Sequence, residues 1–232
     1  MDETQSPLPV KGRGAVSNHT GRFEPHERQA ADDGWDLDDP DVAPLRTQVT
    51  FETPRTIIAR NTSPDIPFDR SINPYKGCEH GCVYCFARPS HAYMGLSPGL
   101  DFESRLFAKP NAAALLEREL SKPSYRPRTM HLGSNTDPYQ PIEKTHRITR
   151  GILDVLSAFN HPVSITTKSA MVCRDIDVLA PMAAKGLVNV ALSLTSLDNK
   201  LARALEPRAP TPQKRLDAMA TLTSAGIPVA GM

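Results

Sequence analysis

The feature that most constrains the fold is an alternation of two kinds of segment downstream of residue 55. Short β-branched segments (129–134, 162–169, 188–196, 227–232) alternate with longer segments of helical spacing (111–123, 146–160, 174–186, 210–226). Such alternation with short connections is typical of a parallel sheet covered by helices. With segment 71–77 this gives about five strands, too few for a closed eight-stranded barrel. The sequence therefore predicts an α/β fold: a partial (β/α) barrel of parallel strands with outer helices.

The first 54 residues lack both periodicities. Positions 24 to 41 contain eight acidic residues and one arginine, Arg28, and prolines are frequent. A segment that buries little apolar area cannot offset the entropy lost on ordering. We expect residues 1–54 to be a disordered acidic, Pro-rich arm and residues 55–232 to be the core domain. In an alternative interpretation, Trp35 and Leu37 dock the arm onto the domain or a partner.

Bulk properties narrow the class of protein. The net charge is +1, so the overall charge does not indicate binding to nucleic acid or to an anionic membrane. The sequence contains no apolar run long enough for a membrane span, and its polar start does not resemble a signal peptide. Clustered thiols without such a signal fit a reducing compartment. These features predict a cytoplasmic protein without membrane contact.

Three of the four cysteines lie within eight residues, as Cys78, Cys82 and Cys85 in "CEHGCVYC". Thiolates select zinc or iron–sulfur clusters. Structural zinc wants four ligands, which His80 or His91 would have to complete, although we expect the His80 ring to point out of the tight loop. Electron-transfer [4Fe-4S] proteins use four cysteines. Three cysteines therefore indicate a cluster with one iron open to another ligand.

The spacing C-x3-C-x2-C, with an aromatic residue before the last cysteine, resembles the radical S-adenosylmethionine (SAM) superfamily. Within it, "NPYKGCEHGCVYCFAR", "HAYMGLSPGLDFE" and "FAKPNAA" are most similar to the spore photoproduct lyase-like branch. The resemblance runs from about residue 55 to the end, where the last strands of the barrel are expected to be missing. It implies a [4Fe-4S] cluster on the three cysteines and SAM on the fourth iron. It also implies reductive cleavage of SAM to a 5′-deoxyadenosyl radical, with an electron donor such as flavodoxin or ferredoxin.

The resemblance also assigns SAM contacts at the strand ends. Tyr84 would lie against the adenine, with a core aromatic as the alternative. Lys168 ends a buried strand, where an unpaired ammonium is costly, so it should meet a carboxylate. By resemblance, that carboxylate belongs to SAM. Ser193 and Thr195 match the place where polar side chains meet the ribose, although hydroxyls are also common in strands.

The segment "GSNTDPYQP" follows the second strand of the predicted barrel. By resemblance, Ser134, Thr136 or Asp137 would receive the methionine amino group. The alternative is an ordinary capping turn, for which these residue types are well suited. Cys173 is expected to be a small buried apolar residue.

The reaction stays open at the level of sequence. Spore photoproduct lyase proper uses a cysteine after the second strand as hydrogen donor, where this chain has Ser134 and Asn135. We expect a radical SAM enzyme with an unassigned substrate, for which nucleic acid is one option, and the sequence names no catalytic residue. The alternatives are a DNA photoproduct repair lyase and a non-catalytic zinc or iron–sulfur binding module.

Overall fold

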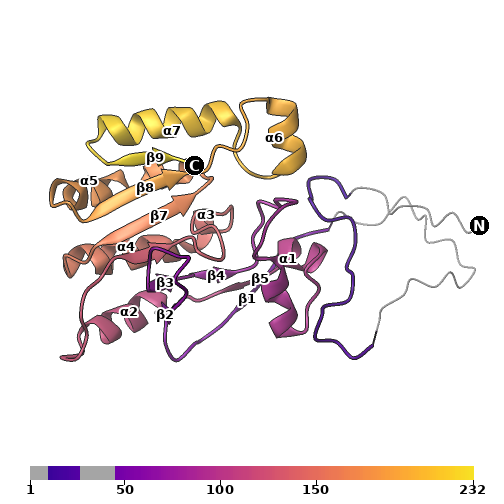
Figure 1. The fold of residues 1–232 in the computed structure, drawn as a ribbon, viewed down its shortest axis with the longest axis horizontal. Helices are drawn as coiled ribbons and strands as arrows, with labels where there is room; N and C mark the ends of the chain where they lie inside the picture. Colours follow the sequence, from indigo (N-terminus) through magenta and orange to yellow (C-terminus); the bar gives the residue numbers. More distant parts are fainter. Residues whose placement is uncertain (1–9, 27–44) are drawn as a thin grey trace, which may run out of the picture.

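A computed structural model describes residues 10–26 and 45–232. Within that part, the main sheet has the strand order β2-β3-β6-β7-β8-β9 (Figure 1). Its strands are β2 Ala59–Arg60, β3 Arg70–Ile72, β6 Met130–Leu132, β7 Val163–Thr167, β8 Val188–Leu192 and β9 Val229–Gly231. All neighbours pair in parallel except β2 and β3. The prediction of a partial barrel with parallel strands is confirmed.

Helices lie between the strands along the chain. They are η1 Arg88–Met94, α1 Leu100–Ser104, α2 Ala112–Leu120, α3 Glu143–His146, α4 Ile148–Ala158, η2 Ala170–Asp175, α5 Ile176–Ala184, α6 Asn199–Leu205 and α7 Pro212–Ser224. Figure 1 shows α2, α4, α5 and α7 stacked along the sheet from bottom to top. None of the helices in the described residues could cross a membrane.

The four longer helices form where helical spacing predicted them. In α4, Ile148, Ile152 and Leu156 recur every four residues and are buried, so one face of the helix packs on the core. Helix α7 begins at Thr211, whose hydroxyl accepts from the Lys214 amide, and Gly226 follows it with a φ of 76°. A left-handed residue there favours glycine and ends the helix. The short helix α6 was not predicted.

Segment 71–77, expected as one strand, is divided between two sheets. β3 belongs to the main sheet, while β4 Tyr75–Lys76 joins a smaller sheet of order β1-β5-β4. In that sheet, β1 Gln48–Phe51 pairs with β5 Arg105–Ala108. Pro74 separates β3 from β4, and it has no amide hydrogen with which to continue a ladder. Strand β4 of the smaller sheet connects β3 to the cysteine loop.

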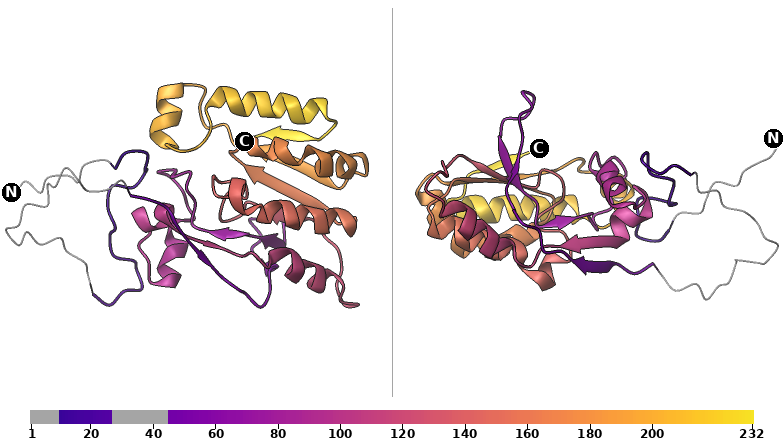
Figure 2. Two further views of the ribbon diagram at one scale, coloured as in Figure 1. Left: turned by 180° about the vertical axis from the view of Figure 1, so that it is seen from behind. Right: turned by 90° about the horizontal axis from the view of Figure 1, so that it is seen from below.

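Part of the predicted arm is ordered against the core. Both views in Figure 2 place residues 10–26 (indigo) beside α1, and β1 also falls within the first 54 residues. Asn18 and Asp101 exchange two hydrogen bonds, and the Ser17 carbonyl accepts from the Leu100 amide. This segment is held by hydrogen bonds rather than by apolar burial, so a composition argument does not detect it. Trp35 and Leu37 lie outside the described residues.

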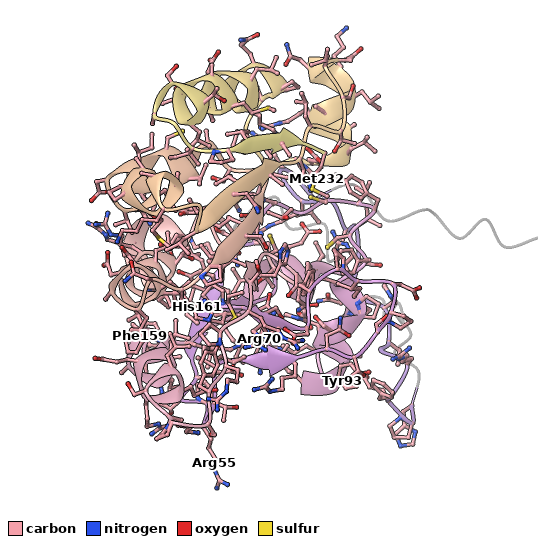
Figure 3. The ribbon with its side chains drawn as sticks, turned by 60° about the vertical axis from the view of Figure 1, so that its left-hand side comes forward. Arg55, Arg70, Tyr93, Phe159, His161 and Met232 are labelled. Atoms are coloured by element: carbon pink, nitrogen blue, oxygen red, sulfur yellow. The ribbon has the colours of Figure 1, made fainter. Side chains whose placement is uncertain are left out.

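A polar cluster closes the end of the sheet opposite the carboxyl ends of the strands. Arg70, at the start of β3, is buried and donates to the Tyr125 hydroxyl and the Arg126 carbonyl. The Tyr125 hydroxyl also lies 2.8 Å from Nε2 of His161. Figure 3 shows Arg70 and His161 near one another, away from Met232 beyond the end of β9. The cluster satisfies buried polar groups and leaves the other end of the sheet for the site.

Candidate functional site

A cavity that is partly open to solvent lies where the parallel strands end. Residues from the cysteine loop and from the segments after β6, β7 and β8 contribute to it. Its lining comprises Cys78, His80, Cys82, Cys85, Phe86, Gly133, Asn135, Thr136, Asp137, Thr166, Thr167, Lys168 and Ser193. The carboxyl ends of parallel strands are where such folds place ligands. Segments that are distant in sequence thus converge on one cavity.

The three clustered cysteines all line this cavity. Cys78 and Cys82 are buried, Cys85 is partly exposed, and all three are free thiols. Burial raises the pKa of Cys78 well above its usual range and that of Cys82 to about 12. Both groups are therefore thiols at neutral pH without a metal, and metal binding must release their protons. Three thiols on one open cavity fit the donor set of an iron–sulfur cluster.

His91, a candidate fourth ligand for zinc, does not join the three cysteines at the cavity. Within residues 10–26 and 45–232, no three His, Cys, Asp or Glu side chains gather closely enough to hold one metal ion. A mononuclear zinc site needs its ligands around one point, whereas a cubane binds each cysteine through a different iron. His91 lies outside the cavity lining, with Nε2 2.9 Å from the Arg105 carbonyl. A zinc site completed by His91 does not form in this arrangement.

His80 differs from the sequence expectation. Its ring does not point out of the loop; it is buried and lines the cavity. Its Nδ1 lies 3.3 Å from a carboxylate oxygen of Asp137. Because the loop bends back between Cys78 and Cys82, where Gly81 has a φ of 67°, the ring is carried inward. No local feature of the sequence indicates this reversal.

Buried side chains from outside the cysteine loop fix its backbone. The side-chain amide of Gln140 accepts from the Glu79 amide and donates to the Gly77 carbonyl, each at 3.0 Å. These two hydrogen bonds hold the backbone on both sides of Cys78, as a neighbouring strand would. On the other side, Arg88 donates to the Cys82 carbonyl from Nε and Nη2 at 3.1 and 2.9 Å. Arg88 ends the segment "NPYKGCEHGCVYCFAR" and Gln140 lies in "GSNTDPYQP", but neither was assigned a role from the sequence.

The polar residues after β6 have partners within the fold. Asp137 accepts from the Thr167 hydroxyl at 2.6 Å and from the Lys168 amide at 2.8 Å. The Thr136 hydroxyl donates to the Tyr75 carbonyl, and Ser134 bonds to the Asn73 side chain. Burial raises the pKa of Asp137. The charge of His80 and the hydrogen bonds from the Lys168 amide and the Thr167 hydroxyl outweigh burial, so the pKa of Asp137 falls to about 2. The Asp137 carboxylate therefore ties the β6 loop to the end of β7.

Lys168, Tyr84 and Thr195 meet around a residue that sequence analysis missed, Glu206. Nζ of Lys168 lies 4.0 Å from Oε1 of Glu206 and 5.7 Å from the Tyr84 ring centre. The hydroxyls of Tyr84 and Thr195 both donate to that oxygen. Ser193 lines the cavity beside them. Glu206 lies in "EPRAP", whose prolines are typical of a loop, so no feature of the sequence indicated a role for it.

The family model of the radical SAM superfamily matches residues 72–232, which include all three clustered cysteines and every strand end around the cavity. The chain belongs to the radical SAM superfamily. Its fold and its cysteine loop agree with that membership.

Relatives of this radical SAM chain carry no assigned function. It is 41% identical over 188 residues to the uncharacterized protein Rv2578c of Mycobacterium tuberculosis, covering 80% of the chain and 55% of the relative. It is 31% identical over 156 residues to the uncharacterized protein MJ0683 of Methanocaldococcus jannaschii, covering 67% of the chain and 56% of the relative. The chain thus spans about half the length of these relatives.

Solved structures of spore photoproduct lyase share the radical SAM fold. One mutant, with bound AdoMet and dinucleoside spore photoproduct, matches with a TM-score of 0.55 at 14% identity, over 79% of this chain and 50% of that one. Another, complexed with dinucleoside spore photoproduct, matches with a TM-score of 0.55 at 15% identity, over the same shares. At this identity the likeness concerns the fold alone.

Proposed function

We propose that this chain carries the core of a radical SAM enzyme that abstracts a hydrogen atom from an as yet unassigned substrate. The observation that carries the proposal is the presence of three free thiols in the lining of a cavity at the carboxyl ends of the strands. When bound, a [4Fe-4S] cluster supplies the electron that cleaves SAM to methionine and a 5′-deoxyadenosyl radical. A low-potential one-electron donor such as flavodoxin or ferredoxin would have to provide that electron.

In this proposal, the protein residues bind and orient the cofactors. Cys78, Cys82 and Cys85 each hold one iron, and the fourth iron is left for SAM. Lys168 presents an ammonium group at the cavity wall, where it pairs with the SAM carboxylate. Burial lowers the pKa of Lys168, whereas the surrounding acidic groups raise it. The pKa of Lys168 is raised overall, so the ammonium stays charged. The partly exposed Tyr84 ring offers a face to the adenine.

The remaining polar residues differ in how free they are to bind SAM. Ser193 lines the cavity, which suits a contact with the ribose. Thr195 is engaged with Glu206 and would reach the ribose only through its second lone pair. Thr136 and Asp137 are committed to the turn after β6, and Ser134 to Asn73, so the methionine amino group has to share an oxygen already in use.

The repair of a DNA photoproduct is less well supported than the general reaction. Ser134 and Asn135 follow β6, at the place where a lyase of that kind carries its cysteine. Cys173 does not line the cavity, and its sulfur lies 3.7 Å from the Ala218 carbonyl. The substrate therefore stays unassigned in this proposal.

Spectroscopy on the reconstituted protein tests the proposal. The chain is loaded anaerobically with iron and sulfide, reduced, and examined by electron paramagnetic resonance before and after addition of SAM. A cluster signal that shifts on SAM addition is expected, because SAM would bind the open iron. A protein that takes up zinc and forms no cluster would support the alternative metal-binding module, and an unshifted cluster signal would contradict a SAM site.

A further inference from the structure

Glu206 is a carboxylate buried next to the cavity but absent from its lining. It follows α6, and its Oε2 pairs with Nη2 of Arg215 on α7. The Arg215 side chain is also buried and donates to the carbonyls of Pro210 and Ser193 at 2.9 and 3.0 Å. Each nitrogen of this guanidinium thus donates to a fixed acceptor. The pair holds the Glu206 carboxylate in one orientation relative to β8.

The other oxygen of Glu206 faces the site. Oε1 accepts hydrogen bonds from the hydroxyls of Tyr84 and Thr195, and these two hydroxyls lie 3.0 Å apart. The same oxygen is 4.0 Å from Nζ of Lys168. Tyr84 belongs to the cysteine loop, Lys168 follows β7 and Thr195 follows β8. A single oxygen atom therefore joins three segments that are distant in sequence.

We propose that Glu206 is a positioning residue for SAM, holding Tyr84, Thr195 and Lys168 in their binding geometry through its Oε1. This inference rests on the proposed function, because it gives these three residues the SAM contacts described above. Glu206 itself would not touch SAM. Its effect is preorganisation: a hydroxyl fixed before binding loses no rotamer freedom when the ligand arrives.

The charges around Glu206 leave Lys168 available to an anion. Arg215 already neutralises Glu206 through a short pair, whereas Lys168 stands at 4.0 Å, outside hydrogen-bond distance. Coulomb attraction keeps the ammonium near the site without using its donors. A carboxylate entering the cavity can then take those donors while Glu206 keeps its own partner.

The test is SAM binding, measured by equilibrium dialysis of the cluster-loaded chain in the absence of reductant, so that nothing is cleaved. In Glu206→Gln the amide must turn its NH₂ away from Arg215, so the two hydroxyls lose their shared acceptor. We expect the dissociation constant for SAM to rise about tenfold, the effect of one to two hydrogen bonds, while iron and sulfide per chain stay unchanged.

A double-mutant cycle separates positioning from loss of structure. In a Tyr84→Phe/Thr195→Val background, the hydroxyls that Glu206 holds are gone, so Glu206→Gln should cost little further affinity. An equal loss in both backgrounds would overturn the inference. If Glu206→Gln does not fold, Glu206→Asp keeps the charge opposite Arg215 with a shorter reach, and the same non-additivity is expected of it.

Glu143→Gln is the matched control. Glu143 is also fully buried and also accepts from a tyrosine and an arginine, Tyr75 and Arg174, but these two partners do not line the cavity, whereas Lys168 beside Glu206 does. Its SAM affinity should equal that of the wild type, and a loss like that of Glu206→Gln would refute a specific role. Failure of the wild type itself to bind SAM would instead refute the proposed function.

Discussion

Residues 10–26 are held to the cysteine loop through Glu103, and replacing this residue gives a sharp test of the contact. The Glu103 side chain is fully buried and accepts from the amides of Gly14 and Ala15 at 2.9 and 2.8 Å. It also pairs with Arg88, the residue that donates to the Cys82 carbonyl. Glu103→Ala would therefore loosen the N-terminal segment at Gly14 and Ala15 and leave Arg88 without its carboxylate.

The size of the effect follows from burial. Only 13% of the Arg88 side chain is exposed, so it recovers little hydration when its partner is removed. Breaking a buried ion pair from one side costs about 3–5 kcal/mol. With a urea m-value of roughly 2–3 kcal/mol/M for a chain of this size, the unfolding midpoint should fall by about 1–2.5 M.

Urea unfolding followed by circular dichroism measures this shift, with Glu117→Ala as the control. Glu117 is exposed on α2, and its replacement should change the free energy of unfolding by no more than about 0.5 kcal/mol. Limited trypsin digestion should also cut the Glu103→Ala variant faster after Arg13, which is buried in the folded chain. Equal midpoints for the two variants, or unchanged cleavage after Arg13, would refute the docking of this segment.

Three further predictions concern the site. Cys82→Ala should abolish binding of iron, whereas Cys173→Ala should leave it intact; equal iron loss in both would overturn the assignment of three ligands. Gln140→Leu removes both hydrogen bonds beside Cys78, each worth about 1 kcal/mol, and should speed iron loss to a chelator; an unchanged rate would contradict this role of Gln140. The pKa of Asp137 is lowered from 3.8 to about 2, which corresponds to about 2 kcal/mol of folding stability. This contribution is complete above pH 3.8 and is lost as the pH falls through 2. Asp137→Asn should flatten the acid limb of a stability–pH curve, and an unaltered limb would show that this carboxylate does not carry it.

Much of the fold was predictable because its signals are local. The β-branched segments and the helical spacing lie within single elements, and the cysteine loop carries its chemistry in eight consecutive residues. Since the carboxyl ends of parallel strands share one edge, the approach of Lys168 and Ser193 to the cysteines followed from topology alone. The expected SAM contacts stay predictions.

What the sequence did not indicate depends on contacts between distant residues. Glu103 bonds to Gly14 across 89 positions, and Gln140 to Glu79 across 61. Composition predicted disorder for the whole of residues 1–54 because it counts apolar burial and ignores hydrogen bonds of this kind. Glu206 was missed for the same reason, since a glutamate before a proline has no local feature that distinguishes a buried acceptor from a loop residue.

The central claim is that the chain binds a cluster and SAM together and cleaves SAM. The most direct measurement is anaerobic: load the chain with iron and sulfide, add SAM and dithionite, and quantify 5′-deoxyadenosine by liquid chromatography. We predict that 5′-deoxyadenosine forms with the wild-type chain and is absent with Cys82→Ala. Equal amounts from both proteins, or none from a wild-type chain shown to carry the cluster, would contradict the claim.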